Sequence, residues 1–185
     1  MATPQILQCH VWLLDSEPPI WRSFVISDQI TLDELHGVLQ VVMGWEFEHL
    51  YDFKLGRDRY ASQFPMPLEG TSDAAAVSLA SFQLKPGNKF TYTYDFGDGW
   101  RHQITVAEVL PWNDDAELPH CLEGDRACPP EDSGGVWGSE GLMERLADPE
   151  DPEYEELLDW IGIDFDPERF EVAAVNTQLR QHWPS

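Results

Sequence analysis

One amphipathic helix, set between stretches with the composition of β-strands, constrains the fold of this 185-residue chain more than any other feature. Thr31 and Glu34 have the spacing of a capping box, in which each side chain accepts a hydrogen bond from the other residue's backbone amide. The apolar residues that follow lie on one stripe of a helix, and Gly44 stands where a glycine often ends one. The sequence therefore predicts a helix over residues 32–43 with one buried face.

Five stretches rich in β-branched, aromatic and aliphatic residues predict strands, at 6–14, 20–26, 49–55, 89–95 and 101–110. The last two flank Gly97-Asp98-Gly99, a tight connection of the kind that joins hairpin strands. The order is therefore β-β-α-β, followed by a β-hairpin. This order predicts a single α+β domain with a mixed or antiparallel sheet of about five strands and one early helix.

The remainder of the chain has a different composition. Residues 111–138 are loop-like, and 20 of the 34 acidic residues lie after residue 110, many of them at predicted helix starts. Helical patterns follow the loop at 142–146, 151–161 and 166–179. We expect one domain over 1–185, with a sheet-rich part at 1–110 and a C-terminal cluster of acidic loop and helices at 111–185.

Charge and the N-terminus exclude several classes of protein. The formal net charge of −23 disfavours duplex DNA and anionic membranes as partners, because both bind positively charged surfaces. The first eight residues lack the basic and apolar regions of a secretory signal, and no apolar stretch is long enough to span a bilayer. Three cysteines are a sparse and odd set for a disulfide scaffold, so we expect a reducing, cytoplasmic location.

Four short motifs occur in order along the chain: Pro18–Arg22, Met43–Trp45 with His49-Leu50, Tyr94–Trp100 with His102, and Ala127–Asp132 with Gly134-Gly135. Together, over about residues 6–179, they resemble the plasmid pRiA4b ORF-3-like family. The resemblance implies a compact α+β domain and brings no established activity with it. Many relatives have a cysteine where this chain has Ser133, and this difference weakens any metal site built on three thiolates.

The predicted hairpin tip gathers residues that can carry chemistry. Asp95, Asp98 and His102 surround Trp100 there, and carboxylates with an imidazole on one turn can bind a divalent cation or act as acid and base. In the alternative, both aspartates cap the turn backbone and Trp100 packs in the core. The loop at 129–135 has two prolines and two glycines, and it can shape a pocket or pack as a crossover.

His102, Cys121 and Cys128 are the candidates for a zinc site. Six residues separate the two cysteines, whereas paired zinc-binding cysteines are usually separated by about two to four. Buried structural thiols are the alternative, and we otherwise expect no cofactor.

Two functions fit these residues. The first is a non-catalytic, acidic binding module with a basic protein as partner, since no complete set of nucleophile, base and orienting residue is visible. The alternative is a metal-binding, hydrolase-like enzyme that uses His49 with a His, Asp and Cys cluster around the 95–102 hairpin and the 128–135 loop, and it requires at least three of these side chains to converge within metal-ligand distance. For Trp21-Arg22 we expect either that the two side chains stack on each other or that Arg22 forms an ion pair with a carboxylate. The candidate binding residues are Trp21, Arg22, His49, Asp95, Asp98, Trp100, His102, Glu131 and Asp132.

Overall fold

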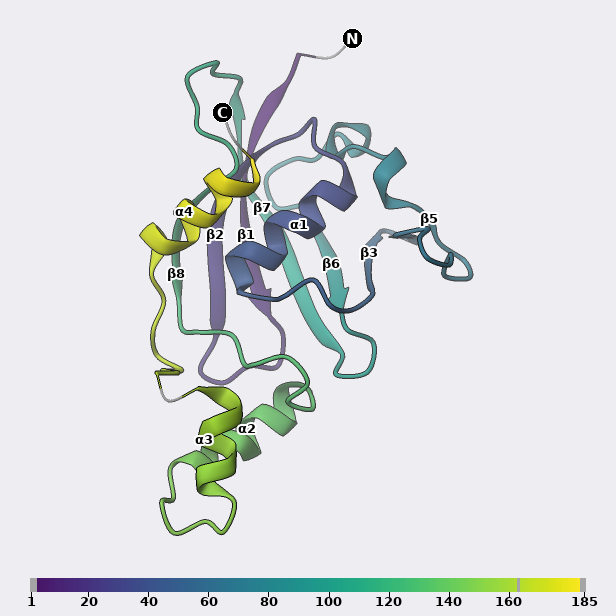
Figure 1. Cartoon of the computed structure of the whole chain (residues 1–185). Coiled ribbons are helices and arrows are strands. Elements are labelled where there is room, and N and C mark those ends of the chain that lie inside the picture. The colour runs from purple at the N-terminus through teal and green to yellow at the C-terminus, as the bar shows by residue number, and fades with distance from the viewer. Residues whose placement is uncertain (1–2, 163, 184–185) are drawn as a thin grey trace.

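The sheet of the molecule has eight strands in the order β5-β4-β3-β6-β7-β1-β2-β8 (Figure 1). This order comes from a computed structural model that describes residues 3–162 and 164–183. Every neighbouring pair is antiparallel except β4 and β5, so the sheet is mixed. The strands are β1 (Gln5–Leu13), β2 (Ile20–Ser27), β3 (Tyr51–Leu55), β4 (Asp58–Ala61), β5 (Ser72–Asp73), β6 (Lys89–Tyr94), β7 (Trp100–Pro111) and β8 (His120–Asp125).

The prediction of about five strands is wrong, because three strands lie in stretches that have the composition of loops. β4 and β5 form one edge of the sheet, and β8 forms the other. These edge strands bury few side chains: one in β4, Ala61, one in β8, Cys121, and none in β5. Their sequences therefore lack the apolar alternation by which a strand is recognised.

The first helix, α1 (Leu32–Met43), has the bounds that the sequence predicts. The Glu34 amide donates to Thr31 Oγ1, and the Thr31 amide donates to the Glu34 carboxylate, which completes the capping box. Gly44 ends the helix in the left-handed conformation, with a φ of 90°. The helix lies across one face of the sheet (Figure 1), and its buried side includes Leu32, Leu35, Val38, Leu39 and Val42.

Three further helices come from the acidic part of the chain: α2 (Gly135–Leu146), α3 (Tyr154–Ile161) and α4 (Val172–His182). Helix α4 packs beside α1 and against β8, whereas α2 and α3 pack on each other beyond one end of the sheet (Figure 1). Helices α3 and α4 start later than predicted, because Asp151 and Asp166 cap short turns ahead of them. Short 3-10 helices lie at Ala74–Ala76 and Leu79–Phe82. Among residues 3–162 and 164–183, the helices have neither the length nor the apolar composition of a membrane span.

Candidate functional site

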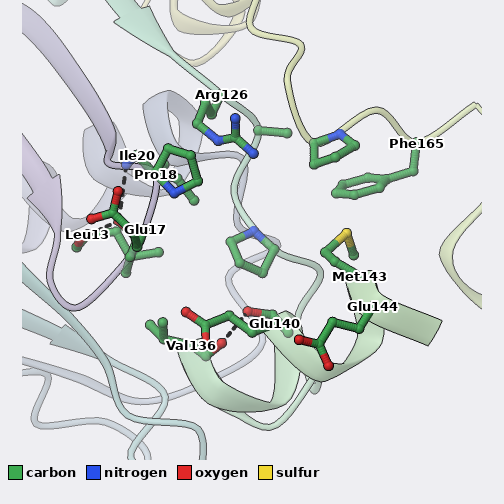
Figure 2. A pocket seen from close by; sticks show the side chains of 15 residues that line it. Leu13, Glu17, Pro18, Ile20, Arg126, Val136, Glu140, Met143, Glu144 and Phe165 are labelled. Atoms are coloured by element: carbon green, nitrogen blue, oxygen red, sulfur yellow. Dashed lines mark hydrogen bonds between the residues drawn. The ribbon is translucent and has the colours of Figure 1, made fainter. Parts of the chain in front are cut away.

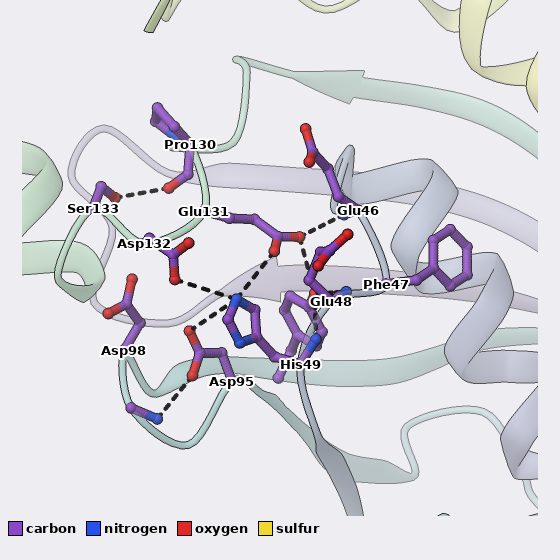
Figure 3. Close-up of polar contacts among 12 residues, drawn as sticks. Glu46, Phe47, Glu48, His49, Asp95, Asp98, Pro130, Glu131, Asp132 and Ser133 are labelled. Carbon is purple, nitrogen blue, oxygen red and sulfur yellow. Dashed lines mark hydrogen bonds and ion pairs between the residues drawn. The ribbon is translucent and has the colours of Figure 1, made fainter. Parts of the chain in front are cut away.

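Three loops meet at the end of the sheet near α2, and they bring together residues that are far apart in the sequence (Figure 3). They are the connection between α1 and β3, the turn between β6 and β7, and the segment between β8 and α2. His49, Asp95 and the pair Glu131-Asp132 each come from a different one of these loops. We call these four residues the acidic cluster.

In the acidic cluster, three carboxylates face one imidazole. His49 Nε2 lies 3.3 Å from Glu131 Oε2, 3.3 Å from Asp132 Oδ1 and 3.7 Å from Asp95 Oδ2 (Figure 3). The Asp95 and Glu131 side chains are each 10 % exposed, whereas that of Asp132 is 73 % exposed. The cluster is therefore shielded on its inner side and open to solvent at Asp132.

A short network of hydrogen bonds holds Glu131 in place. Its Oε1 accepts hydrogen bonds from the Tyr94 hydroxyl, at 2.9 Å, and from the Glu46 amide. The amides of Glu48 and His49 in turn donate to the Tyr94 hydroxyl oxygen. Burial, and then the bond to Glu131, raise the pKa of Tyr94, so its hydroxyl keeps the proton that it donates. Oε1 of Glu131 is thereby fixed, and Oε2 faces the imidazole.

Asp95 and Asp98 both accept hydrogen bonds from backbone amides, but only Asp95 also joins the acidic cluster. Asp95 has a positive φ of 53°, and its Oδ1 accepts from the Gly97 amide at 2.8 Å while Oδ2 faces His49. Asp98 Oδ2 accepts from the Gly134 amide at 3.0 Å and so ties the turn to the segment between β8 and α2. The turn-capping role that the sequence analysis gave as its alternative is therefore confirmed for Asp95, whereas Asp98 caps a backbone amide of a different loop.

Glycine lets the 129–135 loop approach this turn closely. At Gly135, φ is 75° and an added Cβ would overlap the carbonyl oxygen of Asp98. Within the loop, the Ser133 hydroxyl donates to the Pro130 carbonyl at 2.8 Å. The loop therefore packs against the turn between β6 and β7 and also carries two carboxylates of the acidic cluster (Figure 3).

Two polar atoms of the acidic cluster are buried without a hydrogen-bond partner. They are Nε2 of His49 and Oε2 of Glu131, which lie 3.3 Å apart but outside hydrogen-bond geometry. Buried polar groups in folded proteins nearly always have a partner, because leaving one unpaired costs the free energy of its desolvation. A proton or a cation between the two atoms would satisfy both.

The spacing of the ligand atoms fits coordination of one metal ion. One such atom from each of His49, Asp95 and Asp132 lies within 4.8 Å of the other two. Two ligands bound to one ion at about 2.1 Å are about 3.0 Å apart at an octahedral angle and about 3.4 Å apart at a tetrahedral angle. The distances of 3.3 and 3.7 Å around the imidazole are close to these values. An imidazole with carboxylates suits Mn²⁺, Fe²⁺ or Zn²⁺.

Trp100 and His102 lie in a second, apolar region, which we call the aromatic cluster and which also contains Trp45 and Tyr92. The Trp100 ring is centred 5.0 Å from that of Trp45, and the His102 ring is centred 5.2 Å from that of Tyr92. His102 is fully buried, and burial lowers its pKa to about 4, so its imidazole is neutral at pH 7. Both candidates are therefore core residues and do not belong to the acidic cluster.

Arg22 is almost fully buried, and its guanidinium bonds to backbone carbonyls instead of a carboxylate. Its Nε donates to the Val42 carbonyl, and its Nη1 donates to the carbonyls of Trp21 and of the last residue of β8, at 2.7 to 2.8 Å. The guanidinium lies 3.8 Å from the centre of the Phe170 ring. The Trp21 ring stacks with His10. Both alternatives predicted for Trp21-Arg22 are therefore wrong, and Arg22 joins β2, α1 and β8.

Cys121 and Cys128 are buried near Arg22, and the Cys128 sulfur lies 3.9 Å from the guanidinium. Burial raises the pKa of each thiol to about 11, so both stay protonated at neutral pH. Within the described residues, the convergent group of metal-ligating side chains is the one in the acidic cluster, and it contains neither cysteine nor His102. The three candidate zinc ligands are not brought together as a group.

The sequence analysis missed Tyr94 as a residue that builds the site, and it identified Gly135 only as one of the two glycines of the 129–135 loop. Tyr94 alternates with Phe90 and Tyr92, so its position indicates an inward-facing strand residue and gives no sign that its hydroxyl bonds to two loops. Gly135 carried a signal, since paired glycines after two prolines indicate an unusual backbone or a close approach.

The fold and the site together define a class of protein: an α+β domain with a mixed sheet, one capped helix across it, and an acidic cluster where three loops meet. The profile of the plasmid pRiA4b ORF-3-like proteins matches residues 5–174, and the chain belongs to this family. The predicted family membership is thereby confirmed.

Two relatives match nearly the whole chain, one by sequence and one by structure. An uncharacterized protein of Sinorhizobium fredii, y4hQ, is 40 % identical over an alignment of 177 positions, which covers 92 % of this chain and 89 % of that protein. The crystal structure of MM3350, a protein of unknown function from Methanosarcina mazei Go1, is similar with a TM-score of 0.82 and 32 % identity. That similarity covers 93 % of this chain and 98 % of the other.

Proposed function

We propose that this protein is a non-catalytic binding module whose acidic cluster binds a divalent transition-metal cation. The observation that carries the proposal is the pair of buried atoms Glu131 Oε2 and His49 Nε2, which face each other without a hydrogen bond. The Glu131 side chain is nine-tenths buried. The two hydrogen bonds to Oε1 offset part of the cost of burying this carboxylate, and a proton or a cation at Oε2 would offset more of it.

The net charge of the acidic cluster favours a divalent cation, rather than a proton alone, as the group that offsets its negative charge. Even a protonated imidazole brings one positive charge to three carboxylates, so the cluster keeps a net negative charge. In the part of the chain that the structure describes, no lysine or arginine forms an ion pair with these three carboxylates. A divalent ion offsets this excess and bonds to nitrogen and oxygen ligands at once.

Two further points belong to the same proposal. The buried thiols Cys9, Cys121 and Cys128 are free, which supports a reducing location such as the cytoplasm. The hydrolase-like enzyme stays an alternative prediction. It requires that the bound metal ion keep one coordination position open to substrate. The exposed side of the acidic cluster, at Asp132, is where such a position would lie.

Isothermal titration calorimetry of tag-free, EDTA-treated and desalted protein with MnCl₂ and with ZnCl₂ tests the proposal. We expect one ion to bind per chain for at least one of the two metals. Glu131→Gln keeps an oxygen that can accept from Tyr94 and removes the charge, so we expect a Kd at least about tenfold weaker. His49→Asn removes the nitrogen ligand and should weaken binding at least as much.

His120→Asn is the matched control, because His120 also lies beside a carboxylate, 3.5 Å from Glu117, but outside the acidic cluster. It should bind metal as the wild type does. Circular dichroism and thermal melting without metal show whether each variant is folded. The proposal is overturned if neither metal binds at millimolar concentration, or if Glu131→Gln and His120→Asn weaken binding equally.

A further inference from the structure

A second site, separate from the acidic cluster, lies between the sheet and α2. It is a pocket of about 400 Å³, bordered by the turn between β1 and β2, residues 126–129, α2 and the chain ahead of α4 (Figure 2). This volume is in the range of pockets that bind small ligands or single side chains. Its apolar walls come from Leu13, Ile20, Val136, Met143 and Phe165.

Carboxylates accompany these apolar walls. Glu17, Glu140 and Glu144 line the pocket (Figure 2), and within the described residues none of the three takes part in an ion pair. Arg126 also lines the pocket, but its guanidinium is paired with Glu168 at 2.7 Å. The pocket thus joins an apolar interior to negative charge that the protein itself does not neutralise. We call Glu17, Glu140 and Glu144 the acidic rim.

We infer that this pocket binds a segment of a basic protein, with one apolar side chain inside and Lys or Arg side chains at the acidic rim. An apolar anchor in a pocket supplies affinity, and complementary charge around it supplies specificity and a fast encounter. The rest of the chain adds to this attraction, because 20 of the 34 acidic residues lie after residue 110, where most of the pocket is built.

The same charge argues against the other occupants of such a pocket. A second copy of this chain also carries a net charge of −23, so two copies repel each other. An anionic lipid surface is repelled for the same reason. The remaining partner is a basic one. This inference does not depend on the metal proposal, since the pocket and the acidic cluster share no lining side chain.

The probe is a capped hexapeptide with two leucines between two pairs of lysines, titrated by calorimetry at low and at physiological salt. Two matched peptides separate the two parts of the inference: one has glutamates in place of the lysines, and the other has serines in place of the leucines. We expect both to bind at least about tenfold more weakly than the probe, because each lacks one of the two required features. Higher salt should weaken binding of the probe.

Two triple variants of equal net charge locate the binding. The first, Glu17→Gln/Glu140→Gln/Glu144→Gln, removes the acidic rim. The control, Glu69→Gln/Glu108→Gln/Glu155→Gln, removes three exposed carboxylates that do not line the pocket. We expect the first to lose roughly tenfold in affinity for the probe and the control to lose less than about twofold.

Three outcomes overturn the inference. The first is equal loss in both triple variants, which would mean that the peptide responds only to net charge. The second is equal binding of the serine peptide, which would mean that the apolar interior is not used. The third is an absence of peptide binding at millimolar concentration, including the case in which sedimentation finds that a second copy covers the pocket. Thermal melting checks that every variant is folded.

Discussion

His49 and His102 take opposite roles in two neighbouring regions of the molecule. His49 lies in the acidic cluster, with carboxylate oxygens 3.3 Å from its Nε2. His102 lies in the aromatic cluster, fully buried between rings. Burial keeps the second imidazole uncharged, whereas three carboxylates surround the first, and under the proposed function they bind a cation together with it. The comparison teaches that the surroundings of an imidazole, which are set by long-range packing, decide whether it stabilises the fold or forms a site.

Strand β6 connects the two regions. Tyr92 and Tyr94 are two residues apart, so their side chains lie on the same face of the strand. The Tyr92 hydroxyl accepts from Gln40 at 2.9 Å and lies 2.7 Å from His36 Nδ1, inside the core. The Tyr94 hydroxyl bonds instead to Glu131 and to the loop before β3. A rigid core strand therefore positions the loops of the acidic cluster.

The largest effect should come from breaking the aromatic cluster. Trp100 is fully buried, so Trp100→Ala leaves a large cavity and should lower the free energy of unfolding by about 3–5 kcal/mol. Trp137 is 76 % exposed, and Trp137→Ala should change the free energy of unfolding by less than about 0.5 kcal/mol. Guanidinium unfolding followed by circular dichroism measures both. If Trp100→Ala abolished metal binding but left stability unchanged, the division between a structural and a functional region would be wrong.

The second effect concerns pH and the neutral state of His102. Its pKa is about 4 in the folded protein against a usual 6.5, so the unfolded chain binds more protons between these pH values. The contribution to stability is complete above pH 6.5 and is lost as the pH falls toward 4. It amounts to about 3 kcal/mol for this shift.

His102→Asn should therefore unfold with a weaker pH dependence than the wild type between about pH 7 and pH 5, measured by urea unfolding. The pKa of His36 is also lowered to about 4 by burial, so part of the dependence stays in the variant. Leu142→Ala controls for destabilisation alone, because Leu142 is buried and does not titrate. Equal pH dependence in His102→Asn and the wild type would contradict the neutral core role.

The sequence predicts the helices and strands whose defining residues lie close together in the chain. The helix over 32–43 was predicted to the residue because its cap, its apolar stripe and Gly44 are all close in sequence. The central strands were predicted because they alternate. β4, β5 and β8 were missed because an edge strand with one or no buried residue has no such pattern.

All four residues of the acidic cluster were among the sequence candidates, since carboxylates and histidines in loops have no role in an apolar core. The sequence analysis also expected at least three of the candidates to converge, and His49, Asp95 and Asp132 do, but which of them would converge could not be predicted. Asp95 and His102 were expected together because they flank one turn, yet Asp95 lies with His49 and Glu131 from two other loops. Strand register sends His102 inward, and register depends on the pairing of the whole sheet.

A third, smaller effect should come from Gly135, where the loop of the acidic cluster meets the turn between β6 and β7. Gly135→Ala adds a Cβ that overlaps the Asp98 carbonyl, at a positive φ. Gly56→Ala is the matched control, because Gly56 also has a positive φ but has open space around its Cβ position. The difference between the two losses of unfolding free energy isolates the overlap, and we expect about 1–3 kcal/mol. Equal losses would mean that the contact does not hold the loop.

The smallest effect, and the one that most sharpens the comparison, is that of Glu131→Gln without metal. The change keeps the shape of the side chain and removes one of three neighbouring negative charges, so EDTA-treated protein should become more stable by up to about 1 kcal/mol. Asp151→Asn is the matched control, since Asp151 pairs with Arg145 at 3.0 Å and its pKa is lowered by that arginine. Removing this charge should lower stability, because a carboxylate with a cation beside it gains from its charge.

Thermal melting of both variants in EDTA measures these opposite signs. A carboxylate that stabilises the fold should lower the melting temperature when it is neutralised, as we expect for Asp151. A carboxylate that binds an ion should raise the melting temperature when it is neutralised in the absence of that ion, as we expect for Glu131. If Glu131→Gln were instead destabilising by more than about 1 kcal/mol in EDTA, an ion pair with His49 would already hold the loops together. Addition of the metal is the last measurement: it should raise the melting temperature of the wild type more than that of Glu131→Gln, because the tighter-binding protein gains more stability at the same metal concentration.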